Sequence, residues 1–331
     1  MTGLDVLVLE GAGPASVGVT IDVVDAANRI ADSEPGPRAQ QIDLRIITAR
    51  KDPTVRLRGG LSIDAVGIDG LRPRTWAVVA GLGAAGPTEL DVRLAQPDVL
   101  HVASWLNEAR ATGTRVAASC TGAFVLGAAG ALDGRRCTTT WWLTGVLARL
   151  HPRAVVEPDE LVVTDGPVIT AGAQFAAADL TLEIVTQSCG SDLADAVAGR
   201  LAIARRHSQA PFRRSQAYSD VDPTVAAAES FILANLQRPL RLAEIAAATN
   251  VSPRTLARRI EEAVGVSPMR FVRSIRVETA LGLLRHGGSN LTTIAERVGA
   301  ADPASLSQMI RQATGQPPSA FRTPPASRSQ R

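Results

Sequence analysis

The feature that most constrains this 331-residue chain is a segment near its C-terminal end that occurs twice. Ile245-Ala246 recurs as Ile294-Ala295, 49 residues later. The residues that follow recur at a spacing of 50: Leu256, Ile260, Gly265, Pro268 and Phe271 match Leu306, Ile310, Gly315, Pro318 and Phe321. The spacing changes by one residue in a connecting turn, where insertions cost least. Because stacked-repeat folds need three or more units, two copies argue against a solenoid.

Each copy is predicted to form two short helices joined by a tight turn. The first helices are expected at Leu242–Thr249 and Thr292–Val298. The second helices open with a cap residue and a proline, Ser252-Pro253 and Asp302-Pro303. A polar N-cap residue accepts hydrogen bonds from unpaired backbone N–H groups, and proline at the first helical position loses none. Both second helices end at a glycine, so each copy has the pattern of a helix-turn-helix unit.

A longer helix is predicted between the copies, at Met269–His286, where apolar residues recur at helical spacing before Gly287-Gly288. With this helix the chain resembles the AraC/XylS-type DNA-binding domain. That domain has two helix-turn-helix units joined by a linker helix, and each unit ends in Gly-x-x-Pro-x-x-Phe or a similar pattern, here Gly265–Phe271 and Gly315–Phe321. The resemblance implies an all-α domain that binds double-stranded operator DNA.

The resemblance places two recognition helices in the major groove. In the first, Arg254 and Arg258 share a face beside Ala257, and an arginine there can donate two hydrogen bonds to guanine. Arg259 is expected to meet phosphate. In the second, Gln308 can pair with adenine, but that helix is expected mainly to hold the protein on the DNA backbone. The predicted DNA-contacting residues are Arg254, Thr255, Ala257, Arg258, Arg259, Ser305, Gln308 and Arg311. The alternative is a solvated basic face.

The charge distribution separates the chain into two parts. Residues 1–204 carry 17 basic and 23 acidic side chains, a net charge of −6, and residues 205–331 carry 18 basic and 9 acidic, a net charge of +9. The C-terminal part is therefore expected to meet a polyanion. Arginine supplies all but one of the 35 basic side chains. This bias suits contacts to phosphate and guanine, but a GC-rich genome also produces it.

The composition, 45% hydrophobic and 20% charged, is typical of a soluble globular protein. No apolar run approaches the roughly 18 residues of a membrane span. Asp5 and Glu10 stand where a signal peptide would need positive charge, so a cytoplasmic protein without a membrane partner is expected. Three cysteines without metal-ligand spacing predict neither a disulfide framework nor a metal site. No P-loop or dinucleotide-binding motif follows a strand, and no cofactor is expected.

Strand-like and helical patterns alternate through the first two hundred residues. Strands are predicted at Asp5–Glu10, Leu44–Thr48, Trp76–Ala80, Arg115–Ser119 and Leu161–Val163, and helices at Ile21–Ile30, Val99–Thr112, Gly122–Gly130, Ala173–Cys189 and Asp192–Arg206. This order predicts a three-layer α/β domain with a flavodoxin-like parallel sheet, in which ligands bind beyond the carboxyl ends of the strands. The last two helices are rich in alanine and offer a candidate dimer face.

One strand, Arg115–Ser119, runs into Cys120 with almost no loop and continues into a helix of small residues. This is the pattern of a nucleophile elbow, which aims one side chain at solvent beyond the sheet. A thiol at a helix N-terminus has its thiolate stabilised by the helix dipole. The alternative is a small buried cysteine, which is common in protein cores.

The elbow, together with Leu132–Arg135, Val168–Gly172 and Asp179-Leu180, resembles the ThiJ/PfpI domain, which is related to class I glutamine amidotransferases. Residues 4–322 as a whole are similar to regulators that fuse this domain to an AraC-type C-terminus. Enzymatic relatives carry a histidine near the cysteine and an acidic residue on the first helix. Asp22 matches the acidic position, but Thr140 stands where fused regulators commonly have histidine.

Threonine cannot titrate near neutral pH, so Cys120 lacks the base that a cysteine nucleophile needs. The histidines His101 and His151 are expected at the surface near helix ends. No residue is therefore assigned a catalytic role, and the pocket is expected to recognise a ligand. Gly81 and Gly83 follow a strand, where they form either a plain turn or a set of backbone N–H donors facing the pocket. The candidate pocket residues are Cys120, Thr121, Asp22, Gly81, Gly83 and Thr140.

These observations predict a cytoplasmic, homodimeric transcriptional regulator. Its expected parts are a sensing or dimerisation domain at 1–206, a linker at 207–222, a double helix-turn-helix domain at 223–322 and a disordered tail at 323–331. A small-molecule effector is its expected second partner. The rival hypothesis is a cysteine-dependent hydrolase or amidase with accessory DNA binding. A third is an N-terminal domain that only dimerises.

Overall fold

The computed structural model describes residues 1–33, 41–204, 206, 208–209, 222–286 and 289–322. The chain divides into two compact units, Met1–Arg206 and His207–Arg331. Of the predicted linker at 207–222, only Ser208, Gln209 and Asp222 are among the described residues, and the predicted tail at 323–331 lies outside them. Each unit is described by itself below.

The first unit is built on a seven-stranded sheet with the order β10-β11-β7-β6-β1-β2-β5. The strands are β1 (Thr2–Leu7), β2 (Ile42–Thr48), β5 (Val66–Gly67), β6 (Trp76–Val79), β7 (Arg115–Ser119), β10 (Val162–Asp165) and β11 (Val168–Ala171). Leu4 of β1 is paired with Leu44 on one side and Trp76 on the other, both in parallel register. The central five strands have the flavodoxin-like order.

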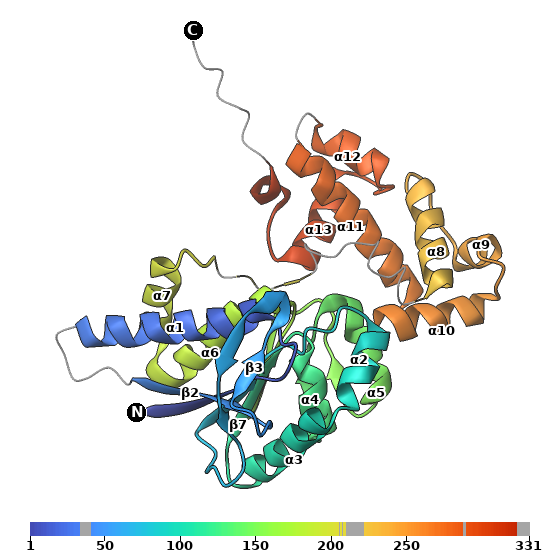
Figure 1. Ribbon diagram of the computed structural model, residues 1–331. Helices are drawn as coiled ribbons and strands as arrows, with labels where there is room; N and C mark the ends of the chain where they lie inside the picture. The colour runs from blue at the N-terminus through green and yellow to red at the C-terminus, as the bar shows by residue number, and fades with distance from the viewer. Residues whose placement is uncertain (34–40, 205, 207, 210–221, 287–288, 323–331) are drawn as a thin grey trace. The chain divides into compact units, whose positions relative to one another are not determined.

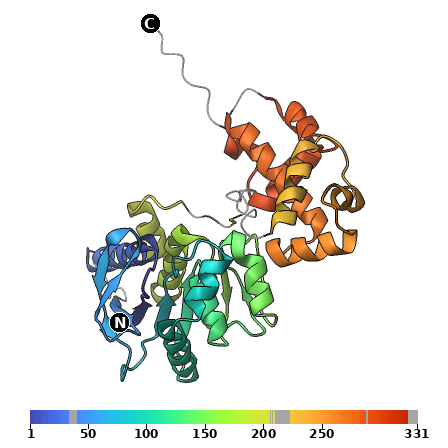
Figure 2. The same ribbon diagram turned by 45° about the vertical axis from the view of Figure 1, so that its right-hand side comes forward.

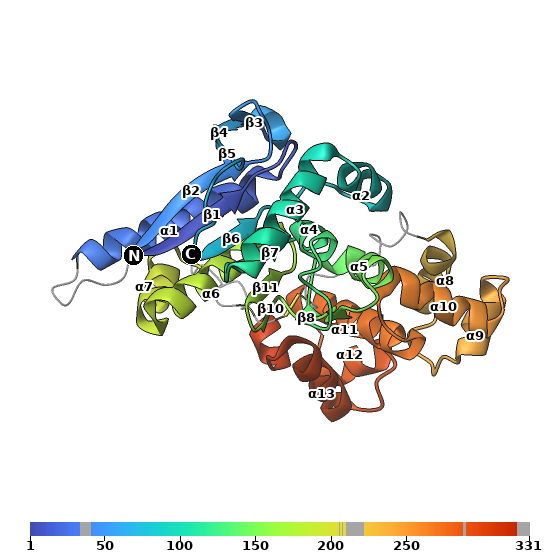
Figure 3. The same cartoon turned by 90° about the horizontal axis from the view of Figure 1, so that it is seen from below.

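Helices cover both faces of this sheet (Figures 1 and 3). On one face lie α1 (Pro14–Ser33), α6 (Ala177–Cys189) and α7 (Ser191–Arg200), and on the other lie α2 (Pro87–Leu94), α3 (Pro97–Ala111), α4 (Gly122–Ala128) and α5 (Thr144–Leu150). Side chains alternate along β1, so that Leu4 and Val6 join the core under α1 while Leu7 joins the core under α3 and α4. The predicted three-layer α/β fold is confirmed.

Short elements complete the unit at its edges. They are the hairpin β3 (Thr54–Arg56) with β4 (Ser62–Asp64), the parallel pair β8 (Arg136–Cys137) with β9 (Val155–Val156), and the 3-10 turns η1 (Arg58–Gly60), η2 (Trp141–Leu143) and η3 (Gln174–Ala176). None of these was predicted as a strand or turn, because two- and three-residue elements are too short to show a period.

The expectation of a wholly parallel sheet is wrong at one edge. β10 pairs with β11 in antiparallel register, with Val163 opposite Thr170. Only Gly166-Pro167 separates the two strands, and a connection this short can join antiparallel strands but not parallel ones. β1 also begins earlier than predicted, at Thr2, and ends at Leu7.

The second unit is helical, and Figure 2 shows its helices in yellow to red. They are α8 (Pro223–Ala234), α9 (Leu242–Ala248), α10 (Pro253–Val264), α11 (Pro268–His286), α12 (Leu291–Arg297) and α13 (Pro303–Thr314), followed by η6 (Pro318–Phe321). The two predicted helix-turn-helix units are α9–α10 and α12–α13. The predicted linker helix is α11, which packs against α8 and α10 as well as α12 and α13.

Local chemistry sets the ends of the two recognition helices. The Ser252 hydroxyl accepts a hydrogen bond from the Thr255 N–H at 3.1 Å, and the Asp302 carboxylate accepts one from Ser305 at 2.6 Å. Gly265 and Gly315 end the helices with φ of 75° and 72°, in the left-handed region that favours glycine. The repeat therefore predicted both helices with their correct first and last residues.

A buried carboxylate fixes one end of the sheet. Asp5 of β1 is fully buried and accepts hydrogen bonds from the Arg45 side chain at 2.8 and 3.0 Å and from the Arg74 backbone N–H at 3.0 Å. The three residues belong to β1, β2 and the segment before β6, so this carboxylate ties three neighbouring chain segments together.

We expect Asp5→Ala to lower the free energy of unfolding by about 3 kcal/mol, since it leaves buried donors without a partner. The matched control is Asp25→Ala, whose carboxylate pairs with Arg29 at the surface and should cost under about 1 kcal/mol. All four tryptophans lie within residues 1–206, so urea unfolding followed by tryptophan fluorescence measures this unit. Equal losses of unfolding free energy in the two variants would contradict the stabilising role of the buried Asp5 carboxylate.

Candidate functional site

Cys120 lies at a sharp turn between β7 and α4. Its φ is +54°, a left-handed conformation that costs a residue with a side chain about 1–3 kcal/mol. Hydrogen bonds hold the turn: the Cys120 N–H donates to the carbonyls of Ala171 at 3.0 Å and Gly172 at 2.8 Å, and the Thr139 hydroxyl donates to the Cys120 carbonyl at 2.7 Å. The elbow predicted from the sequence is present.

The glycine two residues after the cysteine explains how close α4 lies to the sheet. A Cβ atom on Gly122 would stand 2.6 Å from the Val79 carbonyl oxygen and 3.0 Å from that of Ala80. Any other residue would push the helix away from β6. The Cys-Thr-Gly sequence therefore encodes the turn and the close approach together.

The thiol itself is buried, in agreement with the alternative of a small buried cysteine. Cys120 is 9% exposed, and burial raises the pKa of its thiol. Hydrogen bonds from Thr121, through its backbone and its hydroxyl, and from the Thr140 hydroxyl act in the opposite direction but do not outweigh burial. Of the two alternatives, the structure therefore supports the buried cysteine over a dipole-stabilised thiolate facing solvent, and the group is a neutral thiol near pH 7.

No histidine contributes to the pKa of Cys120. His151 follows α5 and packs against Gly127 of α4, and burial lowers the pKa of its imidazole. His151 thus lies at a helix end, as expected, but is half-buried rather than fully exposed. His101 is 42% exposed, as predicted, with its Nε2 3.1 Å from Asp69.

The glycine loop after β6 is held from inside the protein. The Leu82 N–H donates to the Thr121 hydroxyl at 2.8 Å, and the Gly81 carbonyl accepts from the Gly13 N–H at 3.1 Å. The Gly83 carbonyl accepts from the Arg58 guanidinium. The Leu82 N–H is therefore already used, which favours the turn over a set of free backbone donors.

The structure brings most, but not all, of the predicted pocket residues together. Gly81, Thr121 and Thr140 surround Cys120. The Thr140 hydroxyl is buried and makes no hydrogen bond of ordinary geometry within the described part of the chain. Asp22 lies elsewhere: it is exposed on α1 and lines a separate pocket of about 510 Å³ with Phe175.

Other residues at the elbow were not among the predicted pocket residues. Thr139 and Arg58 carry hydrogen bonds of the site. Trp141 is 6% exposed and meets Trp142 edge to face with ring centroids 5.1 Å apart. The Trp142 indole N–H donates to the Ala85 carbonyl at 3.0 Å. This pair therefore contributes to packing beside the elbow.

In the described ranges, no three His, Cys, Asp or Glu side chains are placed to hold a metal ion. Nor does any described helix have the length and apolar character needed to cross a membrane.

The buried thiol can be tested by its reactivity. We expect iodoacetamide to modify Cys120 only slowly at pH 7, because only the thiolate reacts. The pH at which the rate reaches half its maximum should lie above the ordinary thiol pKa of about 8.5. Peptide mass spectrometry over a pH series measures this rate. In urea-unfolded protein the midpoint should return to the ordinary value. A rate already maximal at pH 7 would show that the thiolate dominates.

The first recognition helix, α10, presents a basic face. Leu256 and Ile260 are fully buried, and Arg254 and Arg258 are exposed on the opposite side. Thr255 and Ala257 are half-buried between these faces, as the spacing predicts. The Arg258 guanidinium is held by Glu262, one turn further on, at 2.8 and 3.0 Å.

Arg259 does not point to solvent as expected for a phosphate contact. Its guanidinium donates to the Thr224 hydroxyl and lies 3.4 Å from the Asp222 carboxylate, at the start of α8. The Asp222 carboxylate also caps α8, accepting from the Thr224 N–H at 2.7 Å. Arg259 therefore joins α10 to α8, and its role as a phosphate contact is not supported by this geometry.

The second recognition helix, α13, presents fewer charges. Leu306 and Ile310 are fully buried. Gln308 and Arg311 are exposed, while Ser305 is half-buried with its N–H bonded to Asp302. This face offers one amide and one guanidinium where α10 offers two guanidinium groups.

The two arginines of α10 should differ in their effect on stability. Arg259→Ala removes partly buried hydrogen bonds between helices and is expected to lower the free energy of unfolding of the second unit by about 1–2 kcal/mol. Arg258→Ala removes an exposed pair within one helix and should cost about 0.5 kcal/mol or less. Thermal unfolding followed by circular dichroism compares them. A larger loss of unfolding free energy in Arg258→Ala than in Arg259→Ala would contradict the role of Arg259 in holding α10 to α8.

Comparison with known proteins matches the two units separately. Residues 245–324 match the helix-turn-helix domain family, and residues 83–187 match the DJ-1/PfpI family. The chain is 27% identical over 223 residues to the HTH-type transcriptional regulator GbdR of Pseudomonas aeruginosa, covering 66% of this chain and 60% of that protein. It is 30% identical over 213 residues to the HTH-type transcriptional regulator GlxA of Rhizobium meliloti, covering 63% of this chain and 65% of that protein.

Among solved structures, a ThiJ/PfpI family protein from Pseudomonas syringae superimposes with a TM-score of 0.50 at 18% identity, covering 71% of this chain and 86% of that chain. This likeness concerns the fold alone. The matched region spans about 60% of the length of GbdR, the first of these relatives.

Proposed function

Because the chain joins a DJ-1/PfpI-type domain to an AraC-type helix-turn-helix domain, we propose that it is a sequence-specific DNA-binding regulator of transcription. The observation that carries the proposal is the repeated helix-turn-helix, with two exposed arginines on α10 backed by a buried apolar face. A regulator of this kind acts on DNA in the cytoplasm. The relatives GbdR and GlxA are regulators by name, which supports the same function.

In this proposal α10 and α13 enter successive major grooves, roughly 34 Å apart along the DNA. α11 sets their separation, since it packs against the helices of both units. Arg254 and Arg258 contact base edges, and the exposed Gln308 and Arg311 of α13 contribute more to holding the DNA than to selecting its sequence. Thr255, Ala257 and Ser305 are half-buried, and they set how closely the two recognition helices can approach the DNA.

The first unit acts, in the same proposal, as a non-catalytic sensing and dimerisation module. Burial keeps Cys120 as a thiol, and Thr140 cannot serve as its base. The relatives' names support a regulator rather than an enzyme. The rival hypothesis, a cysteine-dependent hydrolase, requires ester or amide turnover that disappears in Cys120→Ser. Measuring this turnover in both proteins distinguishes a hydrolase from a non-catalytic module. A homodimer agrees with the symmetry common to soluble oligomers.

The division of labour between the two recognition helices predicts different effects on sequence preference. Arg258→Ala should weaken operator binding by about 1–3 kcal/mol and relax the preference at one base pair, because a guanidinium can donate two hydrogen bonds to one guanine. Gln308→Ala should cost less, since a neutral amide makes weaker bonds than a charged group. Selection of binding sites from random DNA, followed by affinity measurement, tests both.

Arg238→Ala serves as a control, because that arginine is exposed and pairs with Glu244 outside α10 and α13. It should leave the selected sequence unchanged. If Gln308→Ala shifts the sequence more than Arg258→Ala does, the division is wrong. If the unaltered protein selects no sequence and shows no salt-dependent affinity for DNA, the proposed function fails.

A further inference from the structure

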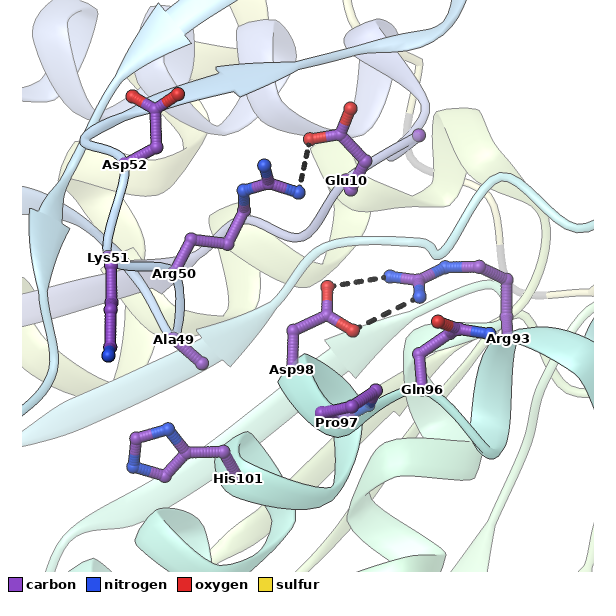
Figure 4. A pocket seen from close by; sticks show the side chains of 11 residues that line it. Glu10, Ala49, Arg50, Lys51, Asp52, Arg93, Gln96, Pro97, Asp98 and His101 are labelled. Atoms are coloured by element: carbon purple, nitrogen blue, oxygen red, sulfur yellow. Dashed lines mark hydrogen bonds and ion pairs between the residues drawn. The ribbon is translucent and has the colours of Figure 1, made fainter.

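A second pocket of the first unit, of about 820 Å³, lies beyond the carboxyl ends of β1 and β2 (Figure 4). Three segments line it: Glu10-Gly11 after β1, Ala49–Asp52 after β2, and Arg93 to His101 between α2 and α3. Carboxyl ends of parallel strands are where α/β folds bind ligands. None of the residues assigned to the elbow lines this pocket.

Most of the charges in the pocket are paired within the protein. Arg50 binds Glu10 at 2.8 Å, and Arg93 binds Asp98 through two hydrogen bonds at 3.2 and 3.1 Å. Asp52 accepts a hydrogen bond from the Thr54 N–H at 3.0 Å. Figure 4 shows the Asp52 side chain pointing in the opposite direction to that of Lys51. The three carboxylates are therefore either neutralised or turned away.

The polar capacity that remains consists of donors. Lys51 is exposed and makes no ion pair or hydrogen bond within the described ranges. The Nε atoms of Arg50 and Arg93 are buried and lack a hydrogen-bond partner there as well. His101 is 42% exposed, and Asp69, its ion-pair partner among the described residues, is 81% exposed. Lys51 extends toward the side of the pocket on which the His101 ring lies (Figure 4).

We propose that this pocket binds a small molecule through an anionic oxygen group, a carboxylate or a phosphate, held by Lys51, Arg50 and His101. An anion pairs with the exposed ammonium of Lys51, whereas a cation would meet that ammonium and the guanidinium groups of Arg50 and Arg93. Asp98 already occupies the N-terminus of α3, where it accepts the Val99 N–H at 2.9 Å. The ligand's anion therefore lies on the Lys51 side rather than at the helix terminus.

The pocket is connected to the elbow by one short segment. Gly11 lines the pocket, and Gly13, two residues later, donates its N–H to the Gly81 carbonyl beside Cys120. The loop between β1 and α1 thus borders the pocket at one end and reaches the turn at Cys120 at the other. The assignment of the bound molecule as an effector rests on the proposed function. The assignment of the pocket as an anion-binding site does not.

Lys51 is the only lysine in the sequence, which gives the experiment a single reporter. Reductive methylation with ¹³C-formaldehyde labels Lys51 and the N-terminal amine of the full chain and keeps the positive charge. Inorganic phosphate and citrate are titrated separately, with sodium chloride at matched ionic strength. We expect a saturable shift of the Lys51 resonance with phosphate or citrate, and none with chloride; the responding ion distinguishes the two anion classes.

The variant His101→Ala should raise the apparent dissociation constant about tenfold, since it removes one donor to an anion. Arg29→Ala, which changes an exposed arginine of α1 outside the pocket, is the matched control and should leave the constant unchanged. Shifts that are linear and equal for all three salts, or a constant that is the same in His101→Ala, would overturn the proposal. Because Lys51 reports only on its own surroundings, anions bound by the second unit give no signal.

DNA affinity of the same methylated protein, measured in parallel, separates this proposal from the proposed function. Intact DNA binding without a Lys51 response refutes the pocket alone. A Lys51 response without DNA binding refutes the regulator and leaves the pocket in place.

Discussion

The first unit depends on one strained residue. Cys120 adopts a positive φ because hydrogen bonds to its N–H and carbonyl come from β11 and from Thr139, and because Gly122 lets α4 lie against β6. The same turn aims Thr121 at the loop after β6. The side chain is buried beside Gly81 and the hydroxyls of Thr121 and Thr140. In other proteins this geometry activates a nucleophile, whereas in this chain it encloses an un-ionised thiol.

The second unit was predictable because its determinants are local. Capping by Ser252 and Asp302 and termination at Gly265 and Gly315 are decided within a few residues, so the repeat located both recognition helices. The role of Arg259 was not predictable in the same way. Its partners on α8 lie 35 and 37 residues away in sequence, and no periodicity reports such a contact.

In the first unit, the sequence predicted most of the sheet strands, five of the helices and the elbow, because those leave a pattern in adjacent residues, but it missed β11, α2 and α5. It left open whether Cys120 is buried, because that depends on contacts with residues such as Thr140, which is distant in sequence. The donors of the second pocket were missed for a related reason. Arg50-Lys51 follow β2 while His101 lies in the first turns of α3, and only the fold of the sheet brings these distant segments to one edge.

The contact between Arg259 and Asp222 bears on how a signal would pass along the chain. Asp222 is where the backbone enters α8, and its carboxylate both caps that helix and holds the guanidinium of α10. Since the same carboxylate serves both contacts, a substitution at Asp222 would loosen the first turn of α8 and release the Arg259 guanidinium of α10 at once.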